Sequence, residues 1–328
     1  MSHYDLPLRL KRLRQTAATR NMLQETRLHP QQFIAPLFIS ETLTEKNAIK
    51  SMPGQYQLPL SALPREIEEL SKLGIPAILL FGLPAYKDAI GSAALREDGI
   101  IQRAIAVIRQ ANPDMLIITD LCCCEYTDHG HCGALNGEQI DNDKTLELLG
   151  QQAVSHAKAG ANWIAPSSMT DGMVKAIRQA LDAEGFHHTA ILSYAVKYSS
   201  CLYGPFREAA QGAPTFGDRK TYQMNPTNTH EALREAALDI QEGADLIMVK
   251  PAMNYLDIIY RLKQTHPEVP LCAYQVSGEY SMLKNAAVQG LINEEQAMVE
   301  SLIAIKRAGA DLIITYFAKD IARYLNSH

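Results

Sequence analysis

Three cysteines lie close together in the sequence and have the spacing of a metal site. Cys122 and Cys124 are separated by one residue, and Cys132 follows after seven more. A one-residue gap places two side chains on the same side of an extended segment, and three thiolates are soft ligands that suit Zn²⁺. Three protein ligands leave a fourth coordination position for water or substrate, as in catalytic zinc sites. The spacing therefore predicts a zinc site, catalytic or structural.

Two further interpretations of this segment stay open. A structural zinc would take His129 or His131 as its fourth ligand, or the cysteines would be buried thiols without a metal. Cys123 is expected to point away from its two neighbours. Cys201 and Cys272 are expected to be small packing or loop residues rather than ligands.

Two lysines stand at the ends of apolar runs, where an unpaired ammonium is costly to bury. Residues 245–249 lead directly into Lys250, and Lys197 follows the run 190–195. Burial and a second cation both lower the pKa of a lysine, and a neutral amine can attack a ketone to form a Schiff base. The pattern predicts a nucleophilic Lys250 with Lys197 as its neighbouring cation. The alternative is a pair of lysines held in ordinary salt bridges.

A polar segment marked by glycine and proline, residues 203–228, follows Lys197. Loops of this length are often lids over a site. Arg207 and Arg219 lie within it, and paired hydrogen bonds from a guanidinium can clamp a substrate carboxylate. Taken alone, such arginines are more often surface charges.

Eight short apolar runs would position these side chains. Each is rich in Ile, Leu and Val and lacks polar alternation, which is typical of strands buried on both faces of a parallel sheet. The predicted strands are residues 33–39, 77–81, 115–121, 163–166, 190–195, 245–249, 271–276 and 311–316.

Amphipathic segments separate these runs, and a repeated Gly-Ala pair marks where helices end. Gly160, Gly243 and Gly309 each precede an apolar run, and glycine there supplies the left-handed residue that stops a helix. The predicted helices are residues 145–159, 171–184, 230–242, 256–264 and 294–308. Alternating helices and eight strands predict an α/β fold, the (β/α)8 TIM barrel. A doubly wound open sheet would show the same local units, so the barrel rests on the count of eight.

Working residues of such a barrel lie at the C-terminal ends of its strands. Asp120 and Ser167 stand at the third and fourth of these ends, and Ser277 and Tyr316 at the seventh and eighth. With the cysteines and the two lysines, six strands would direct polar groups at one face.

Composition limits the classes of function. The 328 residues are 47% apolar and 20% charged, which excludes a disordered chain, a collagen and a coiled coil. A formal charge of -5 offers no basic surface for nucleic acid. No run is long enough to span a bilayer, and no signal peptide is visible. Clustered cysteines indicate reduced thiols, so we expect a cytoplasmic protein with no membrane partner.

The chain is expected to have two parts. Residues 1–30 are basic and contain few core candidates, so we expect an N-terminal arm that packs on another subunit. A frayed terminus is the alternative. Residues 31–328 would form the catalytic barrel.

Several motifs together resemble the porphobilinogen synthase (5-aminolevulinate dehydratase) family. The motifs are residues 120–133, Met248-Val-Lys-Pro-Ala252, Tyr203-Gly-Pro-Phe-Arg207, Gly217-Asp-Arg-Lys220 and Tyr274-Gln-Val-Ser-Gly-Glu-Tyr280. The resemblance runs from about Leu8 to Tyr324, nearly the whole chain. The three cysteines are similar to those of the zinc-dependent branch, since other members carry aspartates in this segment and rely on magnesium.

This resemblance implies a hydro-lyase of tetrapyrrole (heme) biosynthesis. Such an enzyme joins two molecules of 5-aminolevulinate, bound at an A site and a P site, into porphobilinogen with loss of two waters. Lys250 would form the Schiff base with the P-site substrate. Lys197 would serve the A-site substrate, as a second Schiff base or as a cation that tunes Lys250. Cys122, Cys124 and Cys132 would hold the catalytic Zn²⁺.

The resemblance also implies substrate contacts and an assembly. Asp120 and Ser167 would line the pocket near the two amines. The residues implied to hold the A-site carboxylate are Arg207, Arg219 and Gln223, and those for the P-site carboxylate are Ser277 and Tyr316. Glu235 resembles the position of an allosteric Mg²⁺ at subunit interfaces in many bacterial members; without the resemblance it is a surface carboxylate. The family forms homo-octamers in which N-terminal arms contact neighbouring barrels.

Two rival functions fit less of the sequence. A class I aldolase would also use a Schiff-base lysine, but it does not explain the three cysteines. A zinc-binding or redox-sensing relative without catalysis would be favoured by loss of Lys250, Lys197 or the arginines, and none of them is lost.

Overall fold

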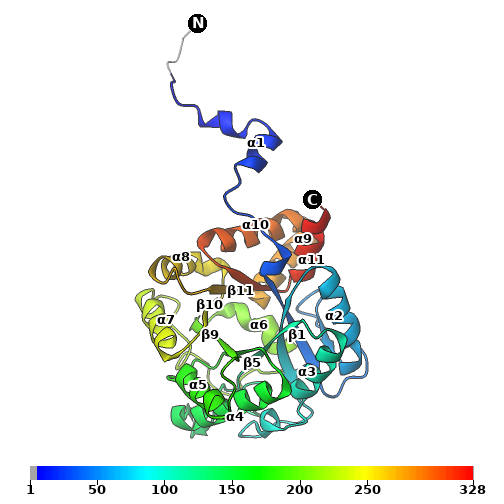
Figure 1. Ribbon diagram of the computed structural model, residues 1–328, viewed down its shortest axis with the longest axis vertical. Helices are drawn as coiled ribbons and strands as arrows, with labels where there is room; N and C mark the ends of the chain where they lie inside the picture. The colour runs from blue at the N-terminus through cyan, green and yellow to red at the C-terminus, as the bar shows by residue number, and fades with distance from the viewer. Residues whose placement is uncertain (1–5, 328) are drawn as a thin grey trace.

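The computed structural model describes residues 6–327, and its centre is a closed ring of eight parallel strands. The strand order is β12-β11-β10-β9-β8-β5-β4-β1, and pairing of β12 with β1 closes the barrel. The ring strands are β1 (Phe33–Ser40), β4 (Ala77–Leu83), β5 (Leu116–Leu121), β8 (Trp163–Pro166), β9 (Ala190–Lys197), β10 (Leu246–Lys250), β11 (Leu271–Gln275) and β12 (Leu312–Thr315). The predicted TIM barrel is confirmed (Figure 1).

Helices surround the ring and cover its outer face (Figure 1). The longer helices are α2 (Leu63–Lys72), α3 (Ile100–Ala111), α4 (Asn142–Ala159), α5 (Met173–Ala183), α7 (His230–Glu242), α8 (Leu256–Thr265), α9 (Ser277–Val288), α10 (Glu294–Ala308) and α11 (Ala318–Ser327). The strands read as continuous apolar runs because side chains inside the barrel and those beneath the helices are both buried.

Three of the helix ends follow from the Gly-Ala pairs. Gly160, Gly243 and Gly309 have φ values of 106°, 108° and 125°, and they end α4, α7 and α10. A residue with a Cβ is strained in this region, whereas glycine adopts it freely. Each helix therefore stops where the chain must return to the ring.

The barrel also carries short 3-10 turns, short strands and a short helix. Short 3-10 turns are η1 (Leu10–Arg14), η2 (Pro30–Gln32), η3 (Leu60–Ala62), η4 (Ser92–Leu95), η5 (Cys201–Tyr203) and η6 (Met253–Tyr255). The short strands are β2 (Asn47–Ala48), β3 (Tyr56–Leu58), β6 (Leu135–Asn136) and β7 (Gln139–Ile140). The short helix α6 (Gly204–Ala209) lies across the middle of the ring in Figure 1. It carries Phe206 and Arg207 to the mouth of the barrel.

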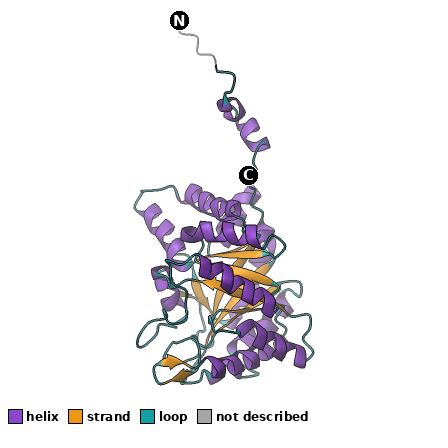
Figure 2. Ribbon diagram, turned by 90° about the vertical axis from the view of Figure 1, so that its left-hand side faces the viewer, coloured by secondary structure: helices purple, strands orange, loops and turns teal. Residues whose placement is uncertain are grey.

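The N-terminal segment projects away from the barrel (Figure 2). It contains η1 and α1 (Ala17–Met22), neither of which buries a residue. Leu8, Leu10 and Met22 are among its exposed apolar side chains. Such a segment lacks a core of its own within one chain, and its role in subunit contacts stays a prediction. No helix within residues 6–327 is long and apolar enough to cross a membrane.

Candidate functional site

Lys197 and Lys250 face each other at the C-terminal ends of neighbouring strands. They are register partners at the last paired position of β9 and β10, and both side chains are buried. The predicted proximity of the two lysines is therefore present in the fold.

Aromatic rings surround the Lys250 ammonium, and the nearby carboxyl groups of Asp120 and Glu125 oppose part of the fall in its pKa. Its Nζ lies 4.4 Å from the ring centre of Tyr274, 5.0 Å from that of Tyr194 and 5.1 Å from that of Phe206. Burial, and then the neighbouring Lys197, lower the pKa of Lys250 to about 7. A large fraction of the amine is therefore neutral near pH 7, as a Schiff-base nucleophile requires. Within residues 6–327 neither lysine forms a salt bridge, so the salt-bridged alternative is wrong.

Lys197 is held by the end of β8. Its Nζ donates to the carbonyl oxygen of Ser167. The Ser167 hydroxyl in turn donates to a carboxylate oxygen of Asp120 at 3.0 Å. Burial raises the pKa of Asp120, and the nearby Lys250 and Lys197 oppose that rise. Asp120 and Ser167 thus lie beside the two amines, as predicted.

A shift in register allows Lys197 to face the barrel interior. Ile247 pairs with Ser193 and Val249 with Val196, so two residues of β9 face one of β10. The Ser193 hydroxyl points out of the barrel and donates to Asp239 of α7 at 2.5 Å. Strict alternation would place Lys197 on the same face as Ser193. The extra residue reverses that alternation and turns Lys197 inward.

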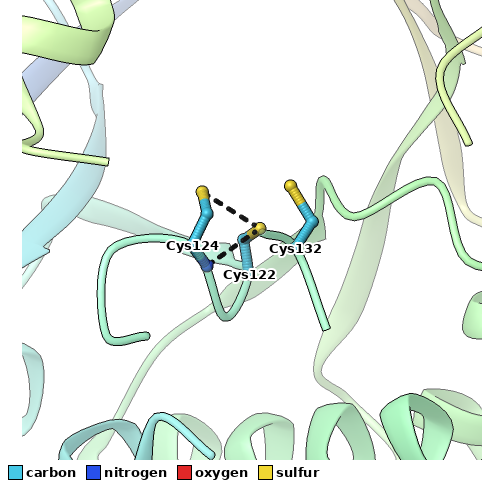
Figure 3. A group of neighbouring side chains, drawn as sticks. All are labelled: Cys122, Cys124 and Cys132. Carbon is cyan, nitrogen blue, oxygen red and sulfur yellow. Dashed lines mark hydrogen bonds between the residues drawn. The ribbon is translucent and has the colours of Figure 1, made fainter. Parts of the chain in front are cut away.

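The three cysteines converge at the end of β5 (Figure 3). The sulfur atoms of Cys122, Cys124 and Cys132 all lie within 4.8 Å of one another, and all three residues are buried. The Sγ atoms of Cys122 and Cys124 are 3.3 Å apart. Cys123 is buried but is not part of this group, Cys201 is exposed, and Cys272 is buried in β11.

The donor set fits a soft dication. Burial and the neighbouring thiols raise the pKa of Cys122, whereas hydrogen bonds from Cys122 and Cys124 lower the pKa of Cys132. Three thiolates this close repel one another unless a cation lies between them. A bound metal ion removes that repulsion, because a coordinating thiol is deprotonated.

His129 and His131, the two candidates for a fourth metal ligand, use their ring nitrogens in other hydrogen bonds. Nε2 of His129 lies 3.2 Å from the carbonyl oxygen of Ala89, and its Nδ1 accepts the His131 backbone N–H at 3.1 Å. The His131 ring lies 3.0 Å from the Phe216 carbonyl oxygen through Nε2 and 3.1 Å from the Tyr222 hydroxyl through Nδ1. Neither ring has a free nitrogen for a metal. The arrangement therefore favours three protein ligands and an open fourth position, as in catalytic zinc sites.

The segment 203–228 packs directly on the cysteine loop. The Arg219 guanidinium donates to the carbonyl oxygens of Gly130 and Gly212, at 2.7 and 2.6 Å. A Cβ on Gly130 would lie 2.2 Å from the carbonyl oxygen of Ala213, so only glycine allows this approach. The predicted lid and the cysteine loop therefore form one packed unit.

Several buried polar atoms near the lysines and the cysteine loop have no hydrogen-bond partner in the described part of the chain. Within residues 6–327, the buried atoms without a hydrogen-bond partner include Arg207 Nε, Arg219 Nε and Gln223 Nε2. The side chains of Asp120 and Tyr194 interact with each other in the same region. Since buried polar groups are normally paired, the three unpaired atoms indicate a place for a polar ligand. All three belong to predicted site residues.

Ser277 and Tyr316 stand at the ends of the next two strands. The Ser277 hydroxyl accepts the Phe206 backbone N–H at 2.9 Å, which joins α9 to α6. The Tyr316 hydroxyl lies 3.0 Å from that of Tyr274. Both residues are buried, and the ring centre of Tyr316 lies 6.1 Å from that of Tyr274.

Glu235 lies apart from the lysines, on α7. It lines a cavity of about 1110 Å³ that reaches Cys132 and Gln223 at its inner end. Burial, and then the nearby Asp171 and Glu231, raise the pKa of Glu235. No three carboxylates in the described part of the chain are close enough to share an ion. Its role as a magnesium ligand stays a prediction.

Sequence reasoning missed two contributors to the site. Tyr194 lies beneath both lysines, with Lys197 Nζ 5.6 Å from its ring centre, and it points inward because it follows the outward-facing Ser193. Glu279 is fully buried beside the Lys250 loop. Its only sequence signal was its place in the Tyr274–Tyr280 motif.

Comparisons with known proteins point to one family. The family model for delta-aminolevulinic acid dehydratase matches residues 7–324. The chain is 56% identical to the delta-aminolevulinic acid dehydratase of Halalkalibacterium halodurans, with 97% of each chain covered. It is 55% identical to that of Bacillus subtilis, covering 97% of this chain and 98% of the relative.

A solved structure agrees as well. The delta-aminolevulinic acid dehydratase (porphobilinogen synthase) of Toxoplasma gondii, in complex with the reaction product porphobilinogen, superposes with a TM-score of 0.95. That protein is 41% identical, and the match covers 98% of this chain and 92% of that one. The chain therefore belongs to the delta-aminolevulinic acid dehydratase family of lyases.

Proposed function

We propose that this protein condenses two molecules of 5-aminolevulinate into porphobilinogen, with loss of two waters, through a Schiff base on Lys250. The observation that carries the proposal is a buried lysine with a pKa lowered to about 7, paired in register with a second lysine beside three clustered thiols. A class I aldolase would need only the first of these features.

Lys250 supplies the nucleophile for the P-site substrate. Its neutral amine adds to the ketone carbon, and the carbonyl oxygen leaves as water when the imine forms. The rings of Tyr274 and Phe206 exclude solvent around this nitrogen. A carbon–carbon bond forms between the imine carbon and the A-site substrate, and condensation of the P-site amine with the A-site ketone releases the second water. The bond to Lys250 breaks as the ring double bond forms, which returns the lysine as a free amine.

The neighbouring residues orient the A-site substrate. Lys197 provides a cation beside the Lys250 amine, and Asp120 and Ser167 offer oxygens to an incoming ammonium or hydroxyl. The unpaired Nε atoms of Arg207 and Arg219, with the Gln223 amide, supply donors for its carboxylate. Ser277 and Tyr316 serve the P-site carboxylate.

Cys122, Cys124 and Cys132 would hold a zinc ion. The ion would act as a Lewis acid that polarises a substrate oxygen or lowers the pKa of a bound water. Thiolates favour zinc over magnesium, which supports the zinc-dependent branch. We assign an allosteric Mg²⁺ to Glu235, away from the lysines, and homo-octamer contacts to residues 1–30.

The proposal is tested by supplying the zinc-loaded protein with 5-aminolevulinate as the only substrate. We expect one porphobilinogen for every two substrate molecules consumed. Consumption without porphobilinogen, or no consumption, would contradict the proposal.

A further inference from the structure

We propose that Glu279 is a positioning residue for the P site, and that its carboxylate fixes the backbone after Lys250 against the backbone that carries Ser277. This inference rests on the function proposed above and extends it to a residue outside the predicted substrate contacts.

The Glu279 carboxylate is fully buried and is held by backbone N–H groups alone. One oxygen accepts from Met253 at 2.7 Å, and the other accepts from Val276 at 2.8 Å and Ala252 at 3.4 Å. Its exposed fraction is 0%, and it forms no salt bridge within residues 6–327. A buried carboxylate without a cation is costly unless several donors hold it. The bonds to these two segments oppose that cost, and burial still raises the pKa of Glu279 to about 7.

The carboxylate joins two chain segments where strand pairing has ended. Register pairs between β10 and β11 run from Ile247 with Leu271 to Val249 with Ala273. Beyond them, the segment that leaves Lys250 and the segment that enters Ser277 are no longer paired strands. Glu279 bonds to both segments, to Met253 on one side and to Val276 on the other. Its hydrogen bonds therefore hold the two segments together beyond the last paired residues of β10 and β11.

Helix capping accounts for only part of this arrangement. A glutamate three residues into a helix commonly reaches back to the backbone N–H of the cap residue. In α9 that bond is the one to Val276. The bond to Met253 comes from the turn η6 that follows β10, and it is the shortest of the three. Capping of α9 does not require it.

The hydrogen bonds of Glu279 affect the relative position of Lys250 and Ser277, which would bind the two ends of the P-site substrate. In the function proposed above, Lys250 binds the P-site ketone carbon and Ser277 holds the carboxylate of the same molecule. A displacement of about 1 Å between such groups can cost about 100-fold in rate. A looser loop also admits water to Lys250, which reduces the burial that lowers its pKa.

Glu279→Gln tests this role, because it keeps the shape but replaces one acceptor oxygen with an N–H₂ donor. We expect kcat/KM to fall by about 10- to 100-fold. We also expect the pH midpoint of borohydride trapping of 5-aminolevulinate on Lys250 to rise by about one unit. Asp245→Asn is the matched control. The Asp245 carboxylate accepts the Ile191 backbone N–H at 2.8 Å, at the opposite end of the barrel. The control should lower thermal stability and leave the midpoint unchanged.

A Glu279→Gln protein with the wild-type midpoint and only a lower Tm would overturn the proposal and leave Glu279 as a helix cap. If that variant does not fold, Glu279→Asp is measured in the same way, with the same expected and contradicting results, because its shorter carboxylate does not reach both segments. Absence of an adduct in the wild-type protein would instead overturn the proposed function. The two failures are therefore distinguishable.

Discussion

Lys197 and Lys250 are register partners at the last paired position of two neighbouring parallel strands. Their side chains are buried on the same face of the barrel, and the ring of Tyr194 lies within 5.6 Å of both ammonium groups. The Lys197 cation disfavours protonation of the buried Lys250 amine. This relationship makes a neutral amine available near physiological pH.

The first prediction concerns the pH dependence of that amine. Because the pKa of Lys250 is lowered to about 7, trapping at Lys250 should be slow below pH 6. It should rise by about tenfold per unit toward pH 7 and level off above pH 8. Borohydride trapping at a fixed short time across this range measures the curve. A midpoint near 10, the ordinary value for lysine, would contradict it.

Lys197→Met should move this curve to higher pH. The substitution removes the cation that lowers the pKa of Lys250, so protonation is favoured and less neutral amine is present at pH 7. The midpoint for trapping at Lys250 should rise, whereas Lys197→Arg should keep it low. Equal midpoints in the two variants would show that burial alone sets the pKa.

Removal of one cysteine should remove the metal. We expect Cys132→Ala to lose stoichiometric zinc and to lose activity by about 100-fold or more, since a Lewis acid supplies several kcal/mol of transition-state stabilisation. Cys123→Ala is the control, because Cys123 lies outside the group of three. It should retain zinc. Metal analysis after dialysis distinguishes them, and full zinc retention by Cys132→Ala would contradict the ligand assignment.

The lid should loosen when its bonds to the cysteine loop are broken. His131→Phe removes the contacts to Tyr222 and Phe216, each worth about 1 kcal/mol. We expect faster amide exchange in residues 212–224 and a higher KM for 5-aminolevulinate. Tyr222→Phe removes only one contact and should give a smaller change. Unchanged exchange in both variants would show that the lid is fixed by other contacts.

Local sequence patterns were enough to predict the barrel and to place much of its candidate site. All eight predicted strands are present, and β8 has the predicted bounds, because an apolar run between helix stops is a local signal. The C-terminal ends of parallel strands lie at one end of the barrel. The order of the strands along the chain was therefore enough to predict that Lys197, Lys250 and the cysteines lie close together.

Other features depend on the three-dimensional arrangement and have no local signal. The register shift in β9 turns Lys197 inward, although simple alternation would place it beside Ser193 on the outer face. The bonds that occupy His129 and His131 come from Ala89, Phe216 and Tyr222, distant in the chain. The sequence therefore left the fourth metal ligand open.

The central claim is a covalent one, that Lys250 forms an imine with 5-aminolevulinate. Incubation of the zinc-loaded protein with this substrate and borohydride, followed by peptide mass spectrometry, tests it directly. We predict a stable reduced adduct on the peptide that contains Lys250 and none in a Lys250→Met variant. A wild-type protein with no adduct on Lys250 would contradict the account.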